Sequence, residues 1–373
     1  MSEEYTSLGL MSGTSGDGVD ASIIQSNGEN KYEEILDKFY EYDSGIYKEI
    51  HILKEKINNS KDLKIFNKDL KELERKITLF HAKVVKEIRY DRRIDIVGFH
   101  GQTIYHNPQE KISLQLGDGN LLFQLIKKNI IYNFRQNDIK NGGEGAPLAP
   151  VFHRLIMKQK NIELPICILN IGGIANITTI EEYDDNKFSS RDLGPGNCLI
   201  DEWMRNNDKK QFDKNGEVAK HGKVNELILN QALDNFDNRN NKNILSFDTK
   251  DFSLGFVRGL NLEDGAATLT DFTGRIIGAG LLSFLSKTKD KSWRVLVCGG
   301  GRKNATLIEK IKKRISQNIK IQSIDDYGID GDFVESQAFG YLAIRSFLKL
   351  PISFPSTTGC NEPCTGGVMI KNF

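Results

Sequence analysis

The sequence lacks any marked imbalance of charge. Lys and Arg number 51 against 50 Asp and Glu, which leaves a formal net charge of +1. Proteins that bind nucleic acid or an anionic membrane surface usually carry an excess of positive charge, because they must neutralise phosphate groups. The balanced charge argues against both classes, so we expect neither nucleic acid nor membrane among the partners of this chain.

Long hydrophobic runs and a leader sequence are also missing. No apolar stretch approaches the roughly 20 residues that cross a bilayer, and the opening residues MSEEYTSLGL lack the basic start and apolar core of a signal peptide. We therefore expect a cytoplasmic protein. The sequence leaves its oligomeric state undecided, and a homodimer stays open.

Cysteine is scarce, with five residues at unrelated spacings. Cys167 and Cys298 fall in apolar strand-like runs, where a buried thiol is the simpler interpretation. Cys360 and Cys364 are close in sequence, but no second pair accompanies them to complete a zinc site. We expect all five cysteines to be structural or incidental.

The two common nucleotide-binding motifs are absent as well. No G-x-x-x-x-G-K-[ST] occurs, and the glycines of the first glycine-rich stretch do not follow G-x-G-x-x-G. That stretch runs from Leu8 to Ile24 and reads LGLMSGTSGDGVDASII, two apolar strand-like runs around a turn of Gly, Ser, Thr and Asp. If this chain holds a phosphate group, it does so in another way.

We interpret this first stretch as a phosphate-holding hairpin. Its glycines, Gly13, Gly16 and Gly18, allow positive φ and a close approach of ligand to backbone, and Ser12, Thr14 and Ser15 add hydroxyl donors. Asp17 and Asp20 would repel a bare phosphate, so we expect Mg²⁺, held partly through water, to arrive with a nucleotide. Composition alone equally fits a plain tight hairpin.

The same pattern returns about 160 residues later. Ile166 to Ile180 is again apolar strand, glycine turn and apolar strand, with Gly172 and Gly173 at the bend. Trp293 to Ile315 predicts a strand, three glycines (Gly299 to Gly301) and a helix. These glycines could seat an adenosine or a diphosphate, although a simple strand-to-helix turn is also common. Apolar spacings of three and four predict helices at Leu63 to Tyr90 and Leu148 to Lys158.

Several polar residues stand at places suited to chemistry, each with a structural alternative. His100 and Gln102 end an apolar strand, where open α/β sheets place ligands, but such a histidine is as often structural. The stretch 135–150, RQNDIKNGGEGAPLAP, suggests a hinge or an active-site loop, or equally a linker. Asp192 precedes a Gly-Pro-Gly turn, where it could be a catalytic carboxylate or the aspartate of an Asx turn. Asn197 follows the turn and is placed to cap the next helix. Glu335 opens the final helix, where the helix dipole alone would favour it.

Two halves with paired glycine hairpins are typical of the sugar kinase and actin architecture. Within that class the chain closely resembles the anhydro-N-acetylmuramic acid kinases, from Leu8 to about Met369. The matching motifs, in order, are GLMSGTSGDGVDA, GFHGQTIYHNP, LQLGDGN, NFRQNDIKNGGEGAPLAP, LNIGGIANIT, DLGPGNCLID, LEDGAATLTDFT, VCGGGRKN and FPSTTG.

The resemblance implies an α/β fold of two lobes, the duplicated ribonuclease H-like fold, with ATP in the cleft between the lobes. Lobe I would comprise residues 1–135 and 343–373, and lobe II residues 136–342. Enzymes of this family use ATP and a water molecule to open the 1,6-anhydro bridge of anhydro-N-acetylmuramic acid. They phosphorylate O6, which yields N-acetylmuramic acid 6-phosphate in cell-wall recycling.

The resemblance also assigns roles to residues. Asp192 would be the general base, and the sugar would contact Glu335, Arg135, His100 and Gln102. Mg²⁺ would accompany the nucleotide, with Asp20 nearby through water. The expected ATP contacts are Gly13, Thr14, Ser15, Gly16, Asp17, Gly18, Val19 and Asp20 in the first hairpin, Gly172 and Gly173 in the second, and Gly299, Gly300 and Gly301 on the adenosine side.

Other functions remain as alternatives. One is a related kinase that acts on a different sugar or anhydrosugar. Another is a nucleotide-switched binding protein of the actin or chaperone kind, which would need a further binding surface. A Rossmann-type oxidoreductase resting on CGGG is a third, but it predicts a G-x-G-x-x-G after an early strand. Phosphoryl transfer fits best, because it requires mainly positioning and charge neutralisation.

Overall fold

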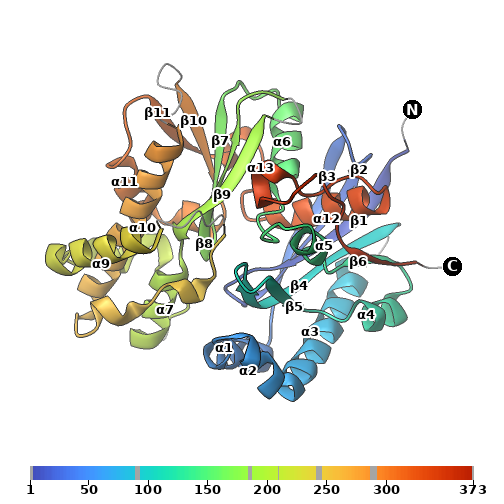
Figure 1. Cartoon of the computed structure of the whole chain (residues 1–373), viewed down its shortest axis with the longest axis horizontal. Helices are drawn as coiled ribbons and strands as arrows, with labels where there is room; N and C mark the ends of the chain where they lie inside the picture. The colour runs from blue at the N-terminus through green and yellow to red at the C-terminus, as the bar shows by residue number, and fades with distance from the viewer. Residues whose placement is uncertain are drawn as a thin grey trace. The chain divides into compact units, whose positions relative to one another are not determined.

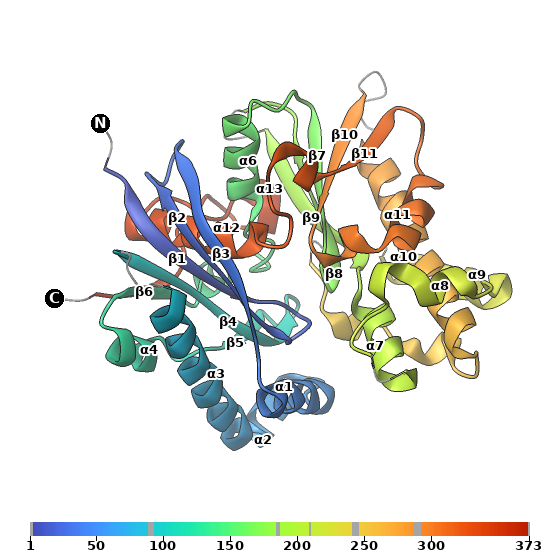
Figure 2. The same cartoon turned by 180° about the vertical axis from the view of Figure 1, so that it is seen from behind.

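The computed structural model describes residues 3–88, 93–183, 187–208, 210–240, 246–285 and 292–371. By internal contacts the chain divides into two compact units (Figures 1 and 2). Unit 1 consists of Met1–Ile162, Tyr183–Ser190 and Phe333–Phe373, and unit 2 of Glu163–Glu182 and Arg191–Asp332. These units differ from the expected lobes in that residues 136–162, 183–190 and 333–342 belong to unit 1. Helices formed by the first and the last of these ranges pack on one another.

Unit 1 is built on a mixed sheet. The strand order is β12-β6-β4-β1-β2-β3, with β5 paired to β4 at the side. Strands β1, β4 and β6 run parallel, while β1–β2 and β2–β3 are antiparallel. The elements of unit 1 are β1 (Tyr5–Ser12), β2 (Gly18–Ser26), β3 (Tyr32–Glu41), α1 (Ser44–Lys56), α2 (Ser60–Ile65), α3 (Asn67–Ile88), β4 (Ile96–Asn107), β5 (Ile112–Leu116), α4 (Gly119–Ile126), β6 (Asn129–Tyr132), α5 (Gln136–Lys140), α6 (Pro150–Gln159), α12 (Val334–Phe347), α13 (Pro355–Thr358) and β12 (Val368–Ile370).

The two faces of this sheet are covered by different helices. Leu8 and Leu10 of β1 belong to a core that includes buried residues of α1 and α3. The residue between them, Gly9, faces α12, and a Cβ atom there would lie 1.9 Å from the carbonyl oxygen of Ser336. Because successive strand residues point to opposite faces, β1 serves both layers, and glycine allows α12 to approach its backbone closely.

Unit 2 repeats the arrangement. Its sheet has the order β11-β10-β7-β8-β9, with β7–β8 antiparallel and β7, β10 and β11 parallel. The elements of unit 2 are β7 (Ile166–Ile171), β8 (Ile174–Ile180), β9 (Phe188–Pro195), α7 (Cys198–Asn207), α8 (Glu217–His221), α9 (Glu226–Asn240), α10 (Leu262–Leu285), β10 (Trp293–Cys298), α11 (Ala305–Lys312), β11 (Ile319–Ser323) and the 3₁₀ helices η1 (Lys214–Gly216), η2 (Thr249–Asp251), η3 (Leu254–Val257), η4 (Gly300–Lys303) and η5 (Ile324–Tyr327).

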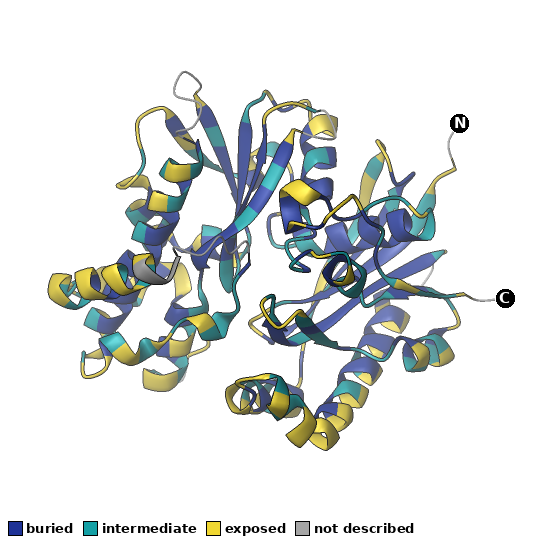
Figure 3. Ribbon diagram, viewed as in Figure 1, coloured by how far each residue is buried: buried dark blue, intermediate teal, exposed yellow. Residues whose placement is uncertain are grey.

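The two sheets share one topology. Read outward from the antiparallel edge, β3-β2-β1-β4-β6 corresponds strand for strand to β9-β8-β7-β10-β11. In both, a glycine-turned hairpin is followed by parallel strands, and the sheet strands are largely buried while the outer helix faces are exposed (Figure 3). The expected α/β fold with a duplicated sheet is thus confirmed.

No helix in the described part of the chain combines the length and the apolar composition that a bilayer crossing requires.

Candidate active site

The first glycine hairpin has the expected form, with β1 and β2 paired from Tyr5 opposite Ser26 to Met11 opposite Asp20. The expected backbone conformation is wrong at two of its three glycines. Only Gly16 adopts positive φ, at 64°. Gly18 is required for space instead, because a Cβ atom there would lie 2.4 Å from the carbonyl oxygen of Tyr40 on β3. Gly13 is uncrowded, and the nearest atom to an added Cβ would be the Ser15 hydroxyl at 3.7 Å.

Buried side chains beneath the turn hold it in place. Gln102 is fully buried, donates from Nε2 to the Gly13 carbonyl at 2.9 Å and accepts from the Ser12 hydroxyl at 2.6 Å. Tyr42 donates to the same Ser12 hydroxyl at 3.0 Å. Gln102, expected to touch the sugar, is therefore placed where it positions the hairpin. The sequence motif identified the residue but not the atoms it contacts.

The other hairpin residues separate into exposed and buried sets. Thr14 and Ser15 are exposed at the tip, and Ser15 donates to Asp17 Oδ1 at 2.6 Å. The Val19 side chain lies in the core of unit 1, so only its backbone could meet a ligand. Asp20 is partly exposed on β2. Of these residues, Thr14 and Ser15 are the most accessible to solvent, and Asp17 and Asp20 are partly accessible.

His100 and Arg135 form a pair in unit 1. His100 Nδ1 lies 2.8 Å from the Gly101 carbonyl, and its Nε2 lies 3.0 Å from Arg135 Nη2. Burial, reinforced by the Arg135 charge, holds the pKa of His100 well below its usual value. A neutral ring protonated on Nδ1 satisfies both contacts, since its Nε2 then accepts from Arg135. His100 thus orients the guanidinium, which also donates to the Gly145 carbonyl at 2.8 Å.

Four buried histidines make unit 1 sensitive to acid. Burial lowers the pKa of His81 and of His153 to about 4. Burial and the charge of Arg135 lower the pKa of His106 to about 3, and the same two causes lower the pKa of His100. An unfolded histidine titrates near 6.5. As the pH falls from that value toward 4, the unfolded chain binds protons that the folded chain does not, so stability falls with pH, by about 1.4 kcal/mol per pH unit for each histidine.

We therefore predict that His81→Gln makes the unfolding free energy depend less steeply on pH between pH 6.5 and 4.5. The slope should fall by up to about 1.4 kcal/mol per pH unit, which corresponds to one proton. The Nδ1 of His81 lies 2.8 Å from the Ile77 carbonyl. Its charge also contributes to the lowered pKa of His100, but less than burial and Arg135 do. Denaturant titrations at several pH values measure the slope. An unchanged slope would show that His81 is protonated in the folded protein.

The loop 135–150, considered as a hinge, an active-site loop or a linker, is ordered. It begins with α5, and the buried Asp138 accepts from the Gly145 amide at 2.7 Å and from Thr358 Oγ1 at 2.6 Å. These contacts hold the segment that carries Arg135. Glu335 is partly exposed in the first turn of α12, and Phe339, one helical turn later, packs on the His100 ring at 4.5 Å. Unit 1 therefore brings the first turn of α12 near the His100–Arg135 pair.

The second glycine hairpin, in unit 2, is tied to the start of α7. The carbonyl of Gly172 accepts from the Asn197 amide at 2.8 Å, and that of Gly173 from the Gly196 amide at 2.9 Å. Asn197 stands at the expected N-cap position of α7, but its side chain does not make the capping hydrogen bond. Its carboxamide donates instead to the Ile171 carbonyl at 3.3 Å. The side chain is needed to join the helix to the hairpin.

Gly299 to Gly301 pack against this hairpin. Gly299 adopts positive φ, at 76°, and an added Cβ would lie 2.4 Å from Asn170 Oδ1. A Cβ at Gly301 would lie 2.2 Å from Ile171 Cγ2. Gly172 and Gly173 follow the carboxyl end of β7, and Gly299 to Gly301 follow that of β10. These two strands are parallel, and the carboxyl ends of parallel strands form the edge where open α/β sheets bind ligands.

Arg302, which the sequence analysis missed, fixes these glycines. Its guanidinium is largely buried, donates to the Gly299 carbonyl at 3.2 Å and pairs with Asp325 at 2.7 Å and with Asp332 at 2.5 Å. Burial raises the pKa of Asp332, but the hydrogen bonds and charges of Arg302 and Lys303 together outweigh burial and lower that pKa. Two features of the sequence could have indicated this role: Arg302 directly follows the glycines, and several aspartates lie between positions 325 and 332.

Asp192 lies in β9 rather than in a turn at a helix terminus. Its side chain is only 6% exposed, and Oδ2 accepts from the Phe247 amide at 2.8 Å. A backbone donor of this kind fixes the orientation of the carboxylate. Such a held carboxylate can act as a general base.

Similarity to known proteins covers the whole chain. A profile of the family "Anhydro-N-acetylmuramic acid kinase" matches residues 5–372. A protein named anhydro-N-acetylmuramic acid kinase in Pelagibacter ubique (strain HTCC1062) is 58% identical over 375 residues, and one so named in Agrobacterium fabrum (strain C58) is 36% identical over 383 residues. Each alignment covers 100% of both chains.

Among solved structures, a ROK family glucokinase from Streptomyces griseus in complex with glucose and AMPPNP aligns with 91% of this chain and 99% of its own. Its sequence identity of 13% and TM-score of 0.41 make this a weak likeness. The full-length sequence matches decide the family, and the expected kinase activity is confirmed. The chain belongs to the anhydro-N-acetylmuramic acid kinase family and is a phosphotransferase with an alcohol group as acceptor.

Proposed function

We propose that this protein uses ATP, Mg²⁺ and one water molecule to open the 1,6-anhydro bridge of anhydro-N-acetylmuramic acid and to phosphorylate O6. The product would be N-acetylmuramic acid 6-phosphate, formed in the cytoplasm during cell-wall recycling. The observation that carries this proposal is the 58% identity, along both complete chains, to a protein named for this substrate.

The placement of Asp192 supports a role for it as the base that activates water. Opening an acetal requires an attack on the anomeric carbon, and a fixed carboxylate can take the proton of the attacking water. Asp192 is buried and held by the Phe247 amide, as a positioned base should be. The oxygen released from C1 is O6, which would then accept the γ-phosphoryl group.

Arg135 is the strongest candidate for a sugar contact in unit 1. His100 and the Gly145 carbonyl fix its guanidinium, which would pair well with the carboxylate of the sugar's lactyl group. Glu335 is proposed to bind hydroxyl or amide groups of the sugar. His100 and Gln102 are proposed to act through Arg135 and the first hairpin rather than on the sugar directly.

For the nucleotide, we propose that Gly13 to Asp20 contact the phosphates through the backbone and the exposed hydroxyls, and that Gly172 and Gly173 provide a second phosphate contact. Gly299 to Gly301 would lie on the adenosine side. Asp20, partly exposed beside the turn, would hold Mg²⁺ through water. The cation would supply neutralisation of phosphate charge.

Isotope labelling tests the proposed reaction. In water enriched in heavy oxygen, the product should carry label in the C1 hydroxyl and none in the phosphate ester, because water attacks carbon and O6 attacks phosphorus. Mass spectrometry of the product and of free phosphate distinguishes the outcomes. Label in free phosphate without sugar turnover would indicate an ATPase, and an unlabelled, still-bridged sugar phosphate would indicate an ordinary sugar kinase.

A further inference from the structure

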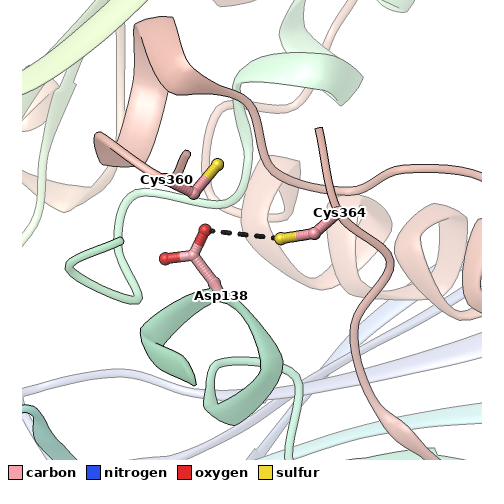
Figure 4. A group of neighbouring side chains, drawn as sticks. All are labelled: Asp138, Cys360 and Cys364. Carbon is pink, nitrogen blue, oxygen red and sulfur yellow. Dashed lines mark hydrogen bonds between the residues drawn. The ribbon is translucent and has the colours of Figure 1, made fainter. Parts of the chain in front are cut away.

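A group of three metal-ligating side chains lies in unit 1, apart from the proposed catalytic residues. Asp138 of α5 faces Cys360 and Cys364, which follow α13 (Figure 4). One donor atom from each residue lies within 4.8 Å of the other two, and all three side chains are buried. Around a tetrahedral zinc ion two sulfur ligands are separated by roughly 3.8 Å, so the ligand atoms need to move by only about 1 Å to enclose one.

The charge of Asp138 provides an independent argument. Its side chain is 1% exposed, and the donors to its carboxylate are neutral: the Gly145 amide, Thr358 Oγ1 and Cys364 Sγ. Within the described residues no Lys, Arg or His forms an ion pair with it. Burying a carboxylate without an opposite charge costs several kcal/mol. A zinc ion held by Asp138 and two thiolates would leave the net charge of the group at −1, but it would place a cation directly against the buried carboxylate.

The surroundings of the thiols also suit thiolate ligands. Ser353 Oγ lies 3.0 Å from Cys364 Sγ, so a hydroxyl is in place to donate to the sulfur. A metal ion takes cysteine as the thiolate, so binding at Cys360 and Cys364 would release both thiol protons. Such hydrogen bonds to ligands are usual around metal sites.

We propose that Asp138, Cys360 and Cys364 bind a single zinc ion. Two sulfur ligands and one carboxylate oxygen select a borderline-soft cation such as Zn²⁺ over Mg²⁺. Binding forms two Zn–S bonds and one Zn–O bond, releases the two thiol protons to solvent, and leaves the fourth tetrahedral position to a water molecule. The Gly145 amide and Thr358 hydroxyl orient the carboxylate from outside the ligand shell.

The ion would connect the 135–150 loop to the end of α13 and the segment that follows it. Two backbone hydrogen bonds already join them, from the Glu144 amide to the Thr358 carbonyl at 2.9 Å and from the Asn361 amide to the Asn141 carbonyl at 3.0 Å. A metal bond at Asp138 would be far stronger than either. The site is therefore structural, and it would steady the loop on which Arg135 lies.

The test uses the full-length protein purified from zinc-supplemented cultures without chelator. Elemental analysis should find one equivalent of zinc per chain. Exchange with Co²⁺ should give the sulfur-to-cobalt charge-transfer band and the intense visible bands of a tetrahedral thiolate site. Cys360→Ser and Cys364→Ser should each lose these bands and at least about tenfold in affinity. Cys198→Ser, a free cysteine of unit 2, is the matched control and should keep both zinc and spectrum.

Several results would overturn the proposal. One is zinc well below one equivalent together with no charge-transfer band on adding Co²⁺. Another is a band that survives in both Cys360→Ser and Cys364→Ser, because the cation then lies elsewhere. A third is a Cys360–Cys364 disulfide, detected by peptide mass after alkylation, in protein saturated with zinc. Circular dichroism of each variant establishes that it folds, so that lost binding reports the site.

Discussion

Asp192→Asn is expected to lower the turnover rate by roughly 10²- to 10⁴-fold. The amide has nearly the shape of the carboxylate, and its oxygen can still accept from the Phe247 amide, which donates to Asp192 at 2.8 Å. It cannot take a proton from water. The fold and the binding of ATP and sugar should therefore persist while the chemical step fails. Single-turnover rates and the affinities of both substrates measure the two effects separately.

A second buried aspartate of unit 2 provides the control. Asp213 is 4% exposed and accepts from the amides of Val218 and Ala219 at the start of α8. Asp213→Asn should change stability, by about 1 kcal/mol, and leave the turnover rate within about twofold. Near-normal turnover in Asp192→Asn would remove this residue from the mechanism and make Glu335 the next candidate base.

Gly13→Val is expected to weaken ATP binding by about a hundredfold, roughly 2.7 kcal/mol, with little loss of stability. The position does not adopt positive φ, and an added Cβ meets no atom closer than 3.7 Å. The folded chain can therefore accommodate the side chain. If phosphate binds over this turn, valine occupies its space. Calorimetric titration with an ATP analogue gives the affinity, and thermal unfolding gives the stability.

Gly16→Ala should show the opposite pattern. Gly16 adopts positive φ, and an added Cβ would lie 2.9 Å from Ile50 Cγ2, so alanine should lower stability, by roughly 1 kcal/mol or more. Its methyl group would point into the protein rather than toward a ligand. If Gly13→Val binds the nucleotide as tightly as the unmodified chain, the first hairpin is only a turn.

Local patterns predicted much of the fold because they report burial directly. Alternating and continuous apolar runs identified both hairpins and β10, and the helix expected at Leu148 to Lys158 is α6, with Pro150 as its first residue. The helix expected from Leu63 to Tyr90 is two helices. The chain leaves helical geometry at Phe66 and resumes at Asn67, although apolar spacing continues across the break; residues 89 and 90 lie outside the described part.

The candidate site was less accessible because its contacts span long distances in the chain. Gln102 meets Ser12 across 90 residues, and Thr358 meets Asp138 across 220. No local periodicity records such pairs. Motif resemblance could place His100 and Gln102 near the site, but the hydrogen bonds that assign them positioning roles depend on tertiary packing. Arg302 was missed for the same reason.

The division of unit 1 between distant parts of the chain affects how the protein is made. The helix that covers β1, β2 and β4 is α12, which is synthesised only after all of unit 2. Gly9 and Gly98 are shaped to receive its backbone, since a Cβ at Gly98 would lie 2.4 Å from the Phe339 carbonyl. During translation, one apolar face of the first sheet therefore stays uncovered until α12 has been made. All of unit 2 is synthesised before that, so unit 2 can complete its own core before unit 1 does.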